Sequence, residues 1–356
     1  MKKTTTYLAD GRRLIYYDSR DDADRTAPDR RPLPPVATAS EIRHDPLLGD
    51  HVAIASHRQD RTYLPPADAC PLCPTREGHP SEIPADGYDV AVFENRFPSL
   101  AGDSGRCEVV CFTSDHDASF ADLTEDRAAL VLAAWTDRTA ALHQLPEVAQ
   151  VFCFENRGAE IGVTLGHPHG QIYAYPFTTP RTARMLDALA AHRTATGANL
   201  FDATVARERA DGTRVVLETA HWTAFVPYAA HWPYEVHLYP RRRVPDLTAL
   251  DDAARTEFPQ VYLELLRRFD RIFGAGDGQG PDADATARTP YIAAWHQAPV
   301  RADDRGEFAL HLELFTIRRT AGKLKFLAGS ESGMNVFIND VPPEAAAQRL
   351  REVATK

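Results

Sequence analysis

The chain has 356 residues, of which 44% are hydrophobic, and a formal net charge of −10. This length suggests two domains or one fold of two similar halves. An acidic balance without a basic block argues against nucleic acid as a partner, and the lack of a run of about 18 apolar residues excludes a membrane span. Met1-Lys2-Lys3-Thr4 continues into polar sequence instead of a signal-peptide core, so we expect a cytoplasmic protein.

The first segment, residues 1–40, contains charged and proline-rich stretches such as Arg-Arg-Pro-Leu-Pro-Pro, and we expect an arm with little core of its own. Val52-Ala53-Ile54-Ala55 then predicts a strand that leads to Arg58 and Arg61. Two arginines three residues apart at a strand end could hold a diphosphate through charge-assisted hydrogen bonds. A solvated charged turn explains this segment equally well.

Cys70 and Cys73 have the spacing of a metal clip and lie among prolines, where no helix is expected. Tetrahedral zinc needs four ligands, so the pair requires two partners from elsewhere. His116 and His167 are the candidates, with His79 as a competitor. A set of two cysteines and two histidines would be closed, and therefore structural rather than catalytic.

A helix with Thr124 at its N-cap precedes the central motif, His167-Pro168-His169-Gly170-Gln171, which lies between two strand-like runs. In an extended chain, period-two alternation would aim His167, His169 and Gln171 at one place. Gly170 would let a ligand approach the backbone. A neutral imidazole can attack phosphorus at physiological pH, whereas an amide only forms hydrogen bonds. The motif predicts a phosphate reaction centre, although a histidine-rich surface loop is the alternative.

The second half repeats the plan of the first. Residues 234–240 echo residues 107–113, a long helix follows each, residues 291–299 parallel residues 151–159, and residues 310–315 fall where the first half carries residues 166–171. The second half lacks the glycine-glutamine ending, so we assign catalysis to the first half. Near the end, residues 323–335 mix lysines, glycines and hydrogen-bonding groups that could bind a phosphorylated sugar.

Five features together resemble a known family: His-Pro-His-Gly-Gln, the Glu-Asn-Arg-Gly-Ala loop before it, Cys-x-x-Cys, Ser-Asp-His and the late Lys-Phe segment. Over residues 41–355 the chain resembles the galactose-1-phosphate uridylyltransferases, of the histidine-triad-like superfamily. The resemblance implies an α+β fold of duplicated half-barrels, with helices packed on antiparallel sheets, usually in a homodimer. We expect the catalytic half at residues 41–195 and a degenerate half at residues 196–356.

The resemblance also implies a reaction. The second histidine of the family motif is the nucleophile, here His169, which takes UMP from UDP-glucose, releases glucose 1-phosphate and passes the UMP to galactose 1-phosphate. We expect a backbone carbonyl to hold the other imidazole nitrogen of His169 and select its tautomer. Gln171 cannot relay protons as a third histidine could, so transfer should prevail over hydrolysis.

Two other functions stay open. One is a related adenylyl- or guanylyl-transferring enzyme, or a phosphorylase acting on another nucleotide sugar or a dinucleoside polyphosphate. The other is a zinc-stabilised nucleotide-binding protein without activity, which would leave His169 and Gln171 without a purpose.

The resemblance assigns site residues by motif. Those for the nucleotide and its phosphates are Arg58, Arg61, Asn95, Asn156, Gly162, Thr164 and Gln171. Those for the hexose are Lys325, Phe326 and Glu331, and those for structural zinc are Cys70, Cys73, His116 and His167. Some members hold a second, iron-type metal with an early glutamate, the histidine matching His296 and a His-x-His pair. That pair reads His311-Leu312-Glu313 here and the glutamate is not evident around Met185, so we expect no second metal.

Overall fold

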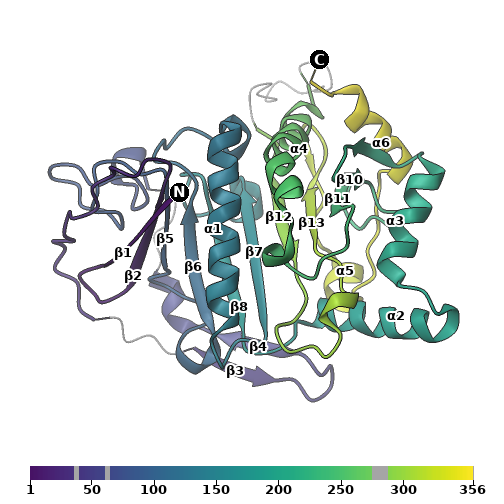
Figure 1. Cartoon of the computed structure of the whole chain (residues 1–356), viewed down its shortest axis with the longest axis horizontal. Helices are drawn as coiled ribbons and strands as arrows, with labels where there is room; N and C mark the ends of the chain where they lie inside the picture. Colours follow the sequence, from purple (N-terminus) through teal and green to yellow (C-terminus); the bar gives the residue numbers. More distant parts are fainter. Residues whose placement is uncertain (36–39, 61–64, 275–287, 356) are drawn as a thin grey trace. The chain divides into compact units, whose positions relative to one another are not determined.

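The computed structural model describes residues 1–35, 40–60, 65–274 and 288–355, which form two compact units (Figure 1). The first unit contains residues 1–154, 164–185 and 297–305, and the second contains the remaining described residues. The chain therefore passes between the units several times, whereas the expected halves are two continuous ranges.

The first unit is built on an antiparallel sheet. Its strands lie in the order β1 (Lys2–Tyr7), β2 (Arg13–Asp18), β5 (Val90–Glu94), β6 (Arg106–Cys111), β8 (His169–Tyr175) and β7 (Gln150–Arg157), the last of which continues into the second unit. A separate hairpin joins β3 (Glu41–His44) and β4 (His51–Ile54).

The prediction that the N-terminal segment is an arm with little core of its own is wrong for residues 2–18. These residues form β1 and β2, and β2 pairs with β5 inside the sheet. Leu14, Tyr16 and Tyr17 are buried there. The charged residues that follow dominated the composition of the segment, but Leu-Ile-Tyr-Tyr is a short run of strong strand formers.

The two faces of this sheet are covered differently. Helix α1 (Glu125–His143) lies on one face, where the Tyr17 hydroxyl donates to Asp137 at 2.6 Å and Arg138 pairs with buried Glu108 at 2.7 Å. It begins at Thr124, whose side chain caps it as the sequence predicts. On the other face, alternate strand residues pack against the segment around Cys70, Leu72, Cys73, Ile83 and Tyr88. The candidate site lies on this second face.

The strands of the second unit are antiparallel neighbours in the order β12 (Tyr291–His296), β13 (His311–Thr316), β11 (Tyr234–Pro240), β10 (Trp222–Phe225) and β9 (Val215–Glu218). Helix α4 (Asp252–Arg271) contacts β10, and α6 (Pro343–Glu352) contacts β9 and β11. The other elements are α2 (Pro180–Thr196), which begins in the first unit, α3 (Leu200–Asp211), β14 (Arg318–Thr320), β15 (Lys323–Leu324) and α5 (Gly329–Met334).

The two units share a topology. In the first, β5, β6, β8 and β7 are neighbours in that order, and in the second β10, β11, β13 and β12 are. A long helix, α1 or α4, follows the second strand of each set along the chain. This confirms the predicted duplication and the α+β class with helices packed on antiparallel sheets.

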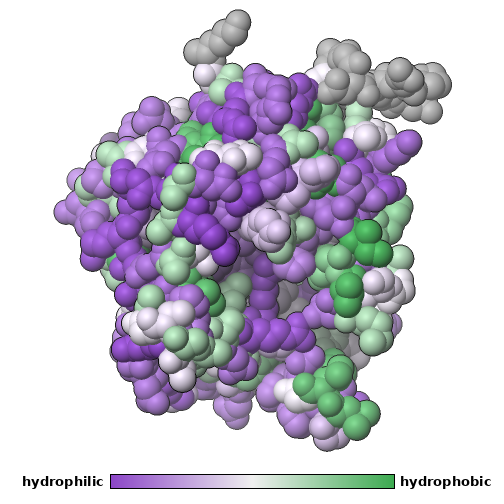
Figure 2. Space-filling view, turned by 90° about the vertical axis from the view of Figure 1, so that its right-hand side faces the viewer, coloured by the Kyte–Doolittle hydropathy of each residue, from purple (hydrophilic) through white to green (hydrophobic). Residues whose placement is uncertain are grey.

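Within the described ranges, no helix offers an apolar stretch long enough to span a bilayer. The face in Figure 2 is mostly hydrophilic, and its hydrophobic residues form small separate groups.

Candidate active site and metal centre

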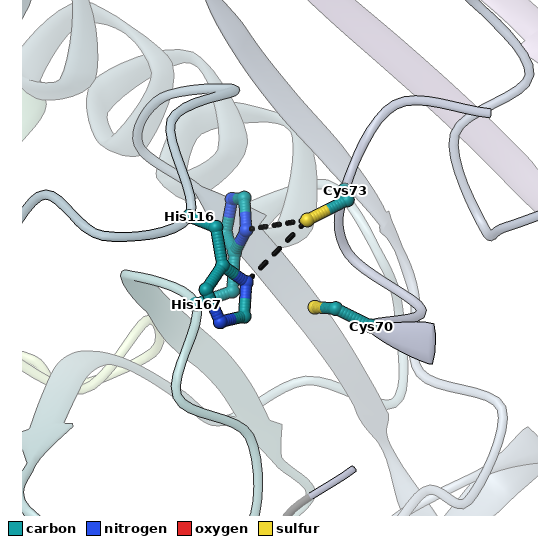
Figure 3. Close-up of side chains that lie close together, drawn as sticks. All are labelled: Cys70, Cys73, His116 and His167. Carbon is teal, nitrogen blue, oxygen red and sulfur yellow. Dashed lines mark hydrogen bonds between the residues drawn. The ribbon is translucent and has the colours of Figure 1, made fainter. Parts of the chain in front are cut away.

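Four potential metal ligands meet on the sheet face opposite α1 (Figure 3). Cys70 and Cys73 come from the segment that covers this face, His116 follows β6, and His167 precedes β8. One donor atom from each lies within 4.8 Å of the others. The Cys73 sulfur is 3.4 Å from Nδ1 of His116 and 3.5 Å from Nδ1 of His167. His79 is exposed and lies outside this group.

This geometry fits tetrahedral zinc. With zinc–sulfur and zinc–nitrogen bonds of about 2.3 and 2.05 Å, the edge between a sulfur and a nitrogen of the tetrahedron is about 3.6 Å. The two observed sulfur–nitrogen distances, 3.4 and 3.5 Å, are close to that edge. Burial raises the pKa of the Cys73 thiol to about 12, with the neighbouring Cys70 acting in the same direction. Thiolate ligands would therefore need a cation such as Zn²⁺ beside them.

The tautomer of His167 also suits a metal. Its Nε2–H donates to the Thr113 carbonyl at 2.8 Å, so Nδ1 carries the lone pair that faces Cys73. Burial lowers the pKa of His167 to about 4, which keeps the ring neutral at pH 7. The set expected from the sequence is therefore assembled, and it can hold a metal.

A cavity of about 230 Å³ lies beside this group in the first unit. It is lined by five of the residues that the sequence analysis assigned to catalysis and phosphate binding: Arg58, Asn95, Thr164, His169 and Gln171. They come from η1 (Ser56–Asp60), the end of β5, the loop before the motif and β8. Apolar side chains such as Phe93, Val109 and Leu165 complete the wall.

His169 stands at the start of β8 with its tautomer fixed. Nδ1–H donates to the backbone carbonyl of His167 at 2.8 Å, as the sequence analysis expected, so Nε2 keeps its lone pair. Burial lowers the pKa of His169, which favours the neutral ring. His169 is therefore in the form in which an imidazole acts as a nucleophile.

Period-two alternation is confirmed for His169 and Gln171, which both line the cavity. It is wrong for His167, which precedes the strand and turns toward Cys73. The carbonyl of His167 nevertheless orients His169, so the metal group and the cavity are coupled through one residue.

The interpretation of Gly170 was also wrong. We expected its missing side chain to admit a ligand, but Gly170 faces the α1 side of the sheet. A Cβ there would lie 2.8 Å from Cζ of Phe112 and 2.8 Å from the Phe154 carbonyl oxygen. Glycine is needed because the neighbouring strand and the Phe112 ring fill the space.

Two residues that line the cavity also form hydrogen bonds to the backbone of Phe97, in the segment that follows β5. Arg58 donates from Nη1 to the Phe97 carbonyl at 2.9 Å. The Asn95 Oδ1 accepts the Phe97 amide hydrogen at 2.8 Å. Arg61 lies outside the described residues. Asn156 and Gly162 belong to the second unit, so their part in phosphate binding stays a prediction.

Sequence reasoning missed Glu82, which lines the cavity. Arg12 and Arg31 pair with it at 2.5 and 3.0 Å, and all three side chains are almost fully buried. No local pattern marks it, because its partners are 51 and 70 residues distant in the chain.

The residues expected to bind hexose lie in the second unit around α5. Lys325 donates to Glu331 at 2.8 Å and to the Ile338 carbonyl, while Phe326 is 74% exposed. Lys325 and the backbone amides around it lower the pKa of Glu331 to about 2. Lys325 and Glu331 thus stabilise this segment, and their contact with a sugar stays a prediction.

Comparisons with known proteins bear on this geometry. Residues 101–179 match the N-terminal domain of galactose-1-phosphate uridyl transferase, and residues 185–356 match its C-terminal domain. The galactose-1-phosphate uridylyltransferase of Streptomyces lividans is 65% identical over 99% of this chain and 98% of its own. The galactose-1-phosphate uridylyltransferase of Thermotoga maritima is 34% identical over 88% of this chain and 98% of its own.

Solved structures have a similar fold. A uridylyltransferase structure superposes with a TM-score of 0.75 at 30% identity, covering 88% of this chain and 98% of its own. An ADP-glucose phosphorylase from Arabidopsis thaliana shares the fold, with a TM-score of 0.67 at 22% identity. The match covers 89% of this chain and 100% of the phosphorylase chain. The sequence matches across both halves show that the chain belongs to the galactose-1-phosphate uridylyltransferase family and is a transferase of galactose metabolism.

Proposed function

We propose that the protein transfers UMP from UDP-glucose to galactose 1-phosphate through a covalent uridylyl-histidine at His169. The observation that carries this proposal is the hydrogen bond from Nδ1 of His169 to the His167 carbonyl, because it leaves Nε2 as a nucleophile in a cavity that also contains Arg58 and Gln171. Membership of the family supports the choice of substrates.

The reaction would proceed in two displacements. Nε2 of His169 attacks the α-phosphorus of UDP-glucose, the bond to the bridging oxygen breaks, and glucose 1-phosphate leaves with that oxygen. A phosphate oxygen of galactose 1-phosphate then attacks the same phosphorus, the phosphorus–nitrogen bond breaks, and UDP-galactose forms. Arg58, Thr164 and the Gln171 amide would stabilise the charge that develops on the phosphoryl oxygens.

Gln171 would determine what discharges the intermediate. Water needs a base to become an effective nucleophile, and an amide cannot act as one. The phosphate of galactose 1-phosphate is already ionised at neutral pH, so it needs little such help. We therefore assign Gln171 a role in favouring transfer over hydrolysis.

The metal would be structural zinc bound by Cys70, Cys73, His116 and His167. Four protein ligands leave no open position for a substrate, so the ion would supply rigidity rather than Lewis acidity. It would fix His167 and, through the His167 carbonyl, the ring of His169. All five cysteines are free and buried, in keeping with a reducing compartment such as the cytoplasm.

The test is covalent labelling. The purified protein is incubated with UDP-glucose radiolabelled at the α-phosphate, without acceptor, and should form an acid-labile, base-stable adduct that galactose 1-phosphate discharges as labelled UDP-galactose. His169→Gly should form no adduct, whereas Gln171→Ala should form it more slowly. Full exchange activity in His169→Gly would remove His169 from its proposed role.

The nucleobase is a separate question, because the fold alone is shared with an ADP-glucose phosphorylase. Unlabelled UDP-, ADP- and GDP-glucose should compete for the labelling reaction, and we expect UDP-glucose to compete best by at least tenfold. Better competition by ADP- or GDP-glucose would favour an adenylyl- or guanylyl-transferring enzyme or phosphorylase. Binding without release of glucose 1-phosphate would favour a protein without activity.

We also propose a homodimer. Between residues 326 and 338 several large hydrophobic side chains are exposed, namely Phe326, Leu327, Met334, Val336 and Ile338. An apolar group of this kind beside polar surface is typical of a protein interface. Sedimentation equilibrium should give twice the chain mass, and Val336→Asp with Ile338→Asp should shift the protein toward the monomer.

A further inference from the structure

The N-terminal hairpin brings a buried arginine to the wall of the cavity that contains His169. Arg12 lies in the turn between β1 and β2, and its side chain is 2% exposed. Strand β2 pairs with β5, which ends next to Asn95 at the cavity (Figure 1). Residues 1–40 precede the range over which the sequence resembles the family, so that resemblance gives Arg12 no role.

The guanidinium of Arg12 donates to three acceptors. Nε donates to the carboxylate of Asp10 at 2.8 Å, and Nη2 donates to Glu82, which lines the cavity, at 2.5 Å. Nη1 donates to the backbone carbonyl of Glu94 at 2.8 Å. The planar guanidinium holds its donors in a fixed arrangement, so these three bonds fix the acceptors relative to one another.

The peptide group between Glu94 and Asn95 is held at both ends. Its carbonyl oxygen accepts from Arg12, and its amide hydrogen is donated to the Cys107 carbonyl at 2.8 Å. The Asn95 side chain in turn accepts the Phe97 amide hydrogen, as described above. Arg12 therefore orients the backbone from which Asn95 reaches the cavity.

A second arginine of the N-terminal segment holds Glu82 from another side. Nη1 of Arg31 lies 3.0 Å from Glu82, and Nη2 of Arg31 donates to Asp29 at 2.7 Å. Burial opposes the ionisation of Asp29, but hydrogen bonds from Arg31 and from the Ala9 amide outweigh it and lower the pKa of this carboxyl. Buried ion pairs add little net stability compared with apolar residues of similar volume, whereas their directional hydrogen bonds restrict geometry.

We propose that Arg12 is a positioning residue for the nucleotide. It fixes the Glu94–Asn95 peptide and the Glu82 carboxylate on the cavity wall, and it acts through them, because Arg12 is not among the described residues that line the cavity. The N-terminal hairpin thus completes the nucleotide site from outside the range of the family resemblance. The inference rests on the proposed function in one respect, that this cavity holds the nucleotide.

The test measures the affinity of the full chain for UMP by isothermal titration calorimetry. Arg12→Gln should weaken binding by roughly 10-fold, the equivalent of one charge-assisted hydrogen bond. Arg12→Lys, which keeps the charge but lacks the guanidinium fork, should recover part of the affinity.

Arg25→Gln is the matched control. Arg25 is also a buried arginine of the N-terminal segment, and it donates to Asp18 and to the Gly87 carbonyl, neither of which lines the cavity. Both glutamine variants should lower the melting temperature, but Arg25→Gln should bind UMP like the wild type. If Arg12→Gln does not fold, Arg12→Lys and Arg25→Lys give the same comparison.

Initial-rate kinetics give a second measure. In Arg12→Gln, kcat/KM for UDP-glucose should fall by roughly 10-fold, and kcat/KM for galactose 1-phosphate by less than about twofold. The two values differ because the uridylyl group is covalently held when galactose 1-phosphate reacts.

Two results would overturn the role of Arg12. One is an affinity for UMP in the Arg12 variants equal to that of the wild type, and the other is an equal loss in the matched Arg25 variants, which would make both arginines merely structural. A wild type that binds UMP without forming an adduct with UDP-glucose would refute the transfer mechanism and leave this inference standing. A wild type that does not bind UMP would refute both.

Discussion

Gly170→Ala is the substitution whose effect is most clearly determined by local geometry. The new methyl group would lie 2.8 Å from Cζ of Phe112 and from the Phe154 carbonyl oxygen, about 0.6 Å inside ordinary contact on two sides. Phe112 cannot easily yield, because its ring packs on Phe120 and Trp135 with centroids 4.9 and 6.0 Å apart. The Phe154 oxygen belongs to the backbone of β7.

The expected change combines two terms. Overpacking a well-filled core costs about 1 to 3 kcal/mol, and replacing glycine lowers the entropy of the unfolded chain by an equivalent of about 0.4 to 1 kcal/mol. We therefore expect a net loss of roughly 1 to 2 kcal/mol and a melting temperature several degrees lower. A strand shifted by about half an ångström between His169 and Gln171 should also slow uridylyl labelling by roughly 10- to 100-fold.

Thermal unfolding by circular dichroism and the rate of labelling by UDP-glucose measure these two effects. Gly166→Ala is the matched control, since its methyl group would meet only Nε2 of His116, at 3.9 Å. Equal melting temperatures and labelling rates for the two variants would refute the reasoning.

Substitutions at three further positions probe the metal, the buried charge and the cavity. Cys73→Ser should lose one metal ion per chain and more than about 3 kcal/mol of stability, since structural zinc sites contribute roughly 10 kcal/mol in small domains; an unchanged metal content would contradict the proposed ligand set. Burial raises the pKa of Glu155 from 4.5 to about 7, so the folded state binds the proton more tightly and loses up to about 3 kcal/mol of stability as the pH rises between these values. Glu155→Gln, which keeps an acceptor for the Tyr291 hydroxyl, should therefore raise the melting temperature more at pH 8 than at pH 5, and a pH-independent effect would contradict this. Gln171→Ala should slow labelling by about 2 to 4 kcal/mol of activation free energy, and Gln171→His should increase the release of free UMP; if Gln171→His releases no more UMP than the wild type, the proposed role of the amide is wrong.

Much of this site could be predicted because the informative residues are close in the sequence. Cys70 and Cys73 identify a metal clip by spacing, and the motif around His169 combines residue type with strand periodicity. The duplicated topology followed from the repeated order of strand, helix, strand and strand. In each case a local pattern carries the physical constraint.

The features that the sequence analysis missed depend on contacts between residues that are far apart in the sequence. The space around Gly170 is filled by Phe112, which directly follows β6 and lies 58 positions earlier in the chain. The ion pairs of Glu82 likewise join residues that only folding brings together. The closeness of His237 on β11 to Glu313 on β13 also escaped notice because it depends on strand register: the two residues are opposite each other in space but 76 positions apart in the chain.

The pairing of β8 with β6 sets Cys111 opposite His169, Val110 opposite Gly170 and Val109 opposite Gln171. If β8 slipped by one residue, every side chain would change face, and either His169 or Gln171 would be forced into the space that only glycine can occupy. The lack of a side chain at Gly170 therefore favours the observed register of β8. A chain in the shifted register would lose both the imidazole and the amide from the cavity, so the two groups depend on the same strand register.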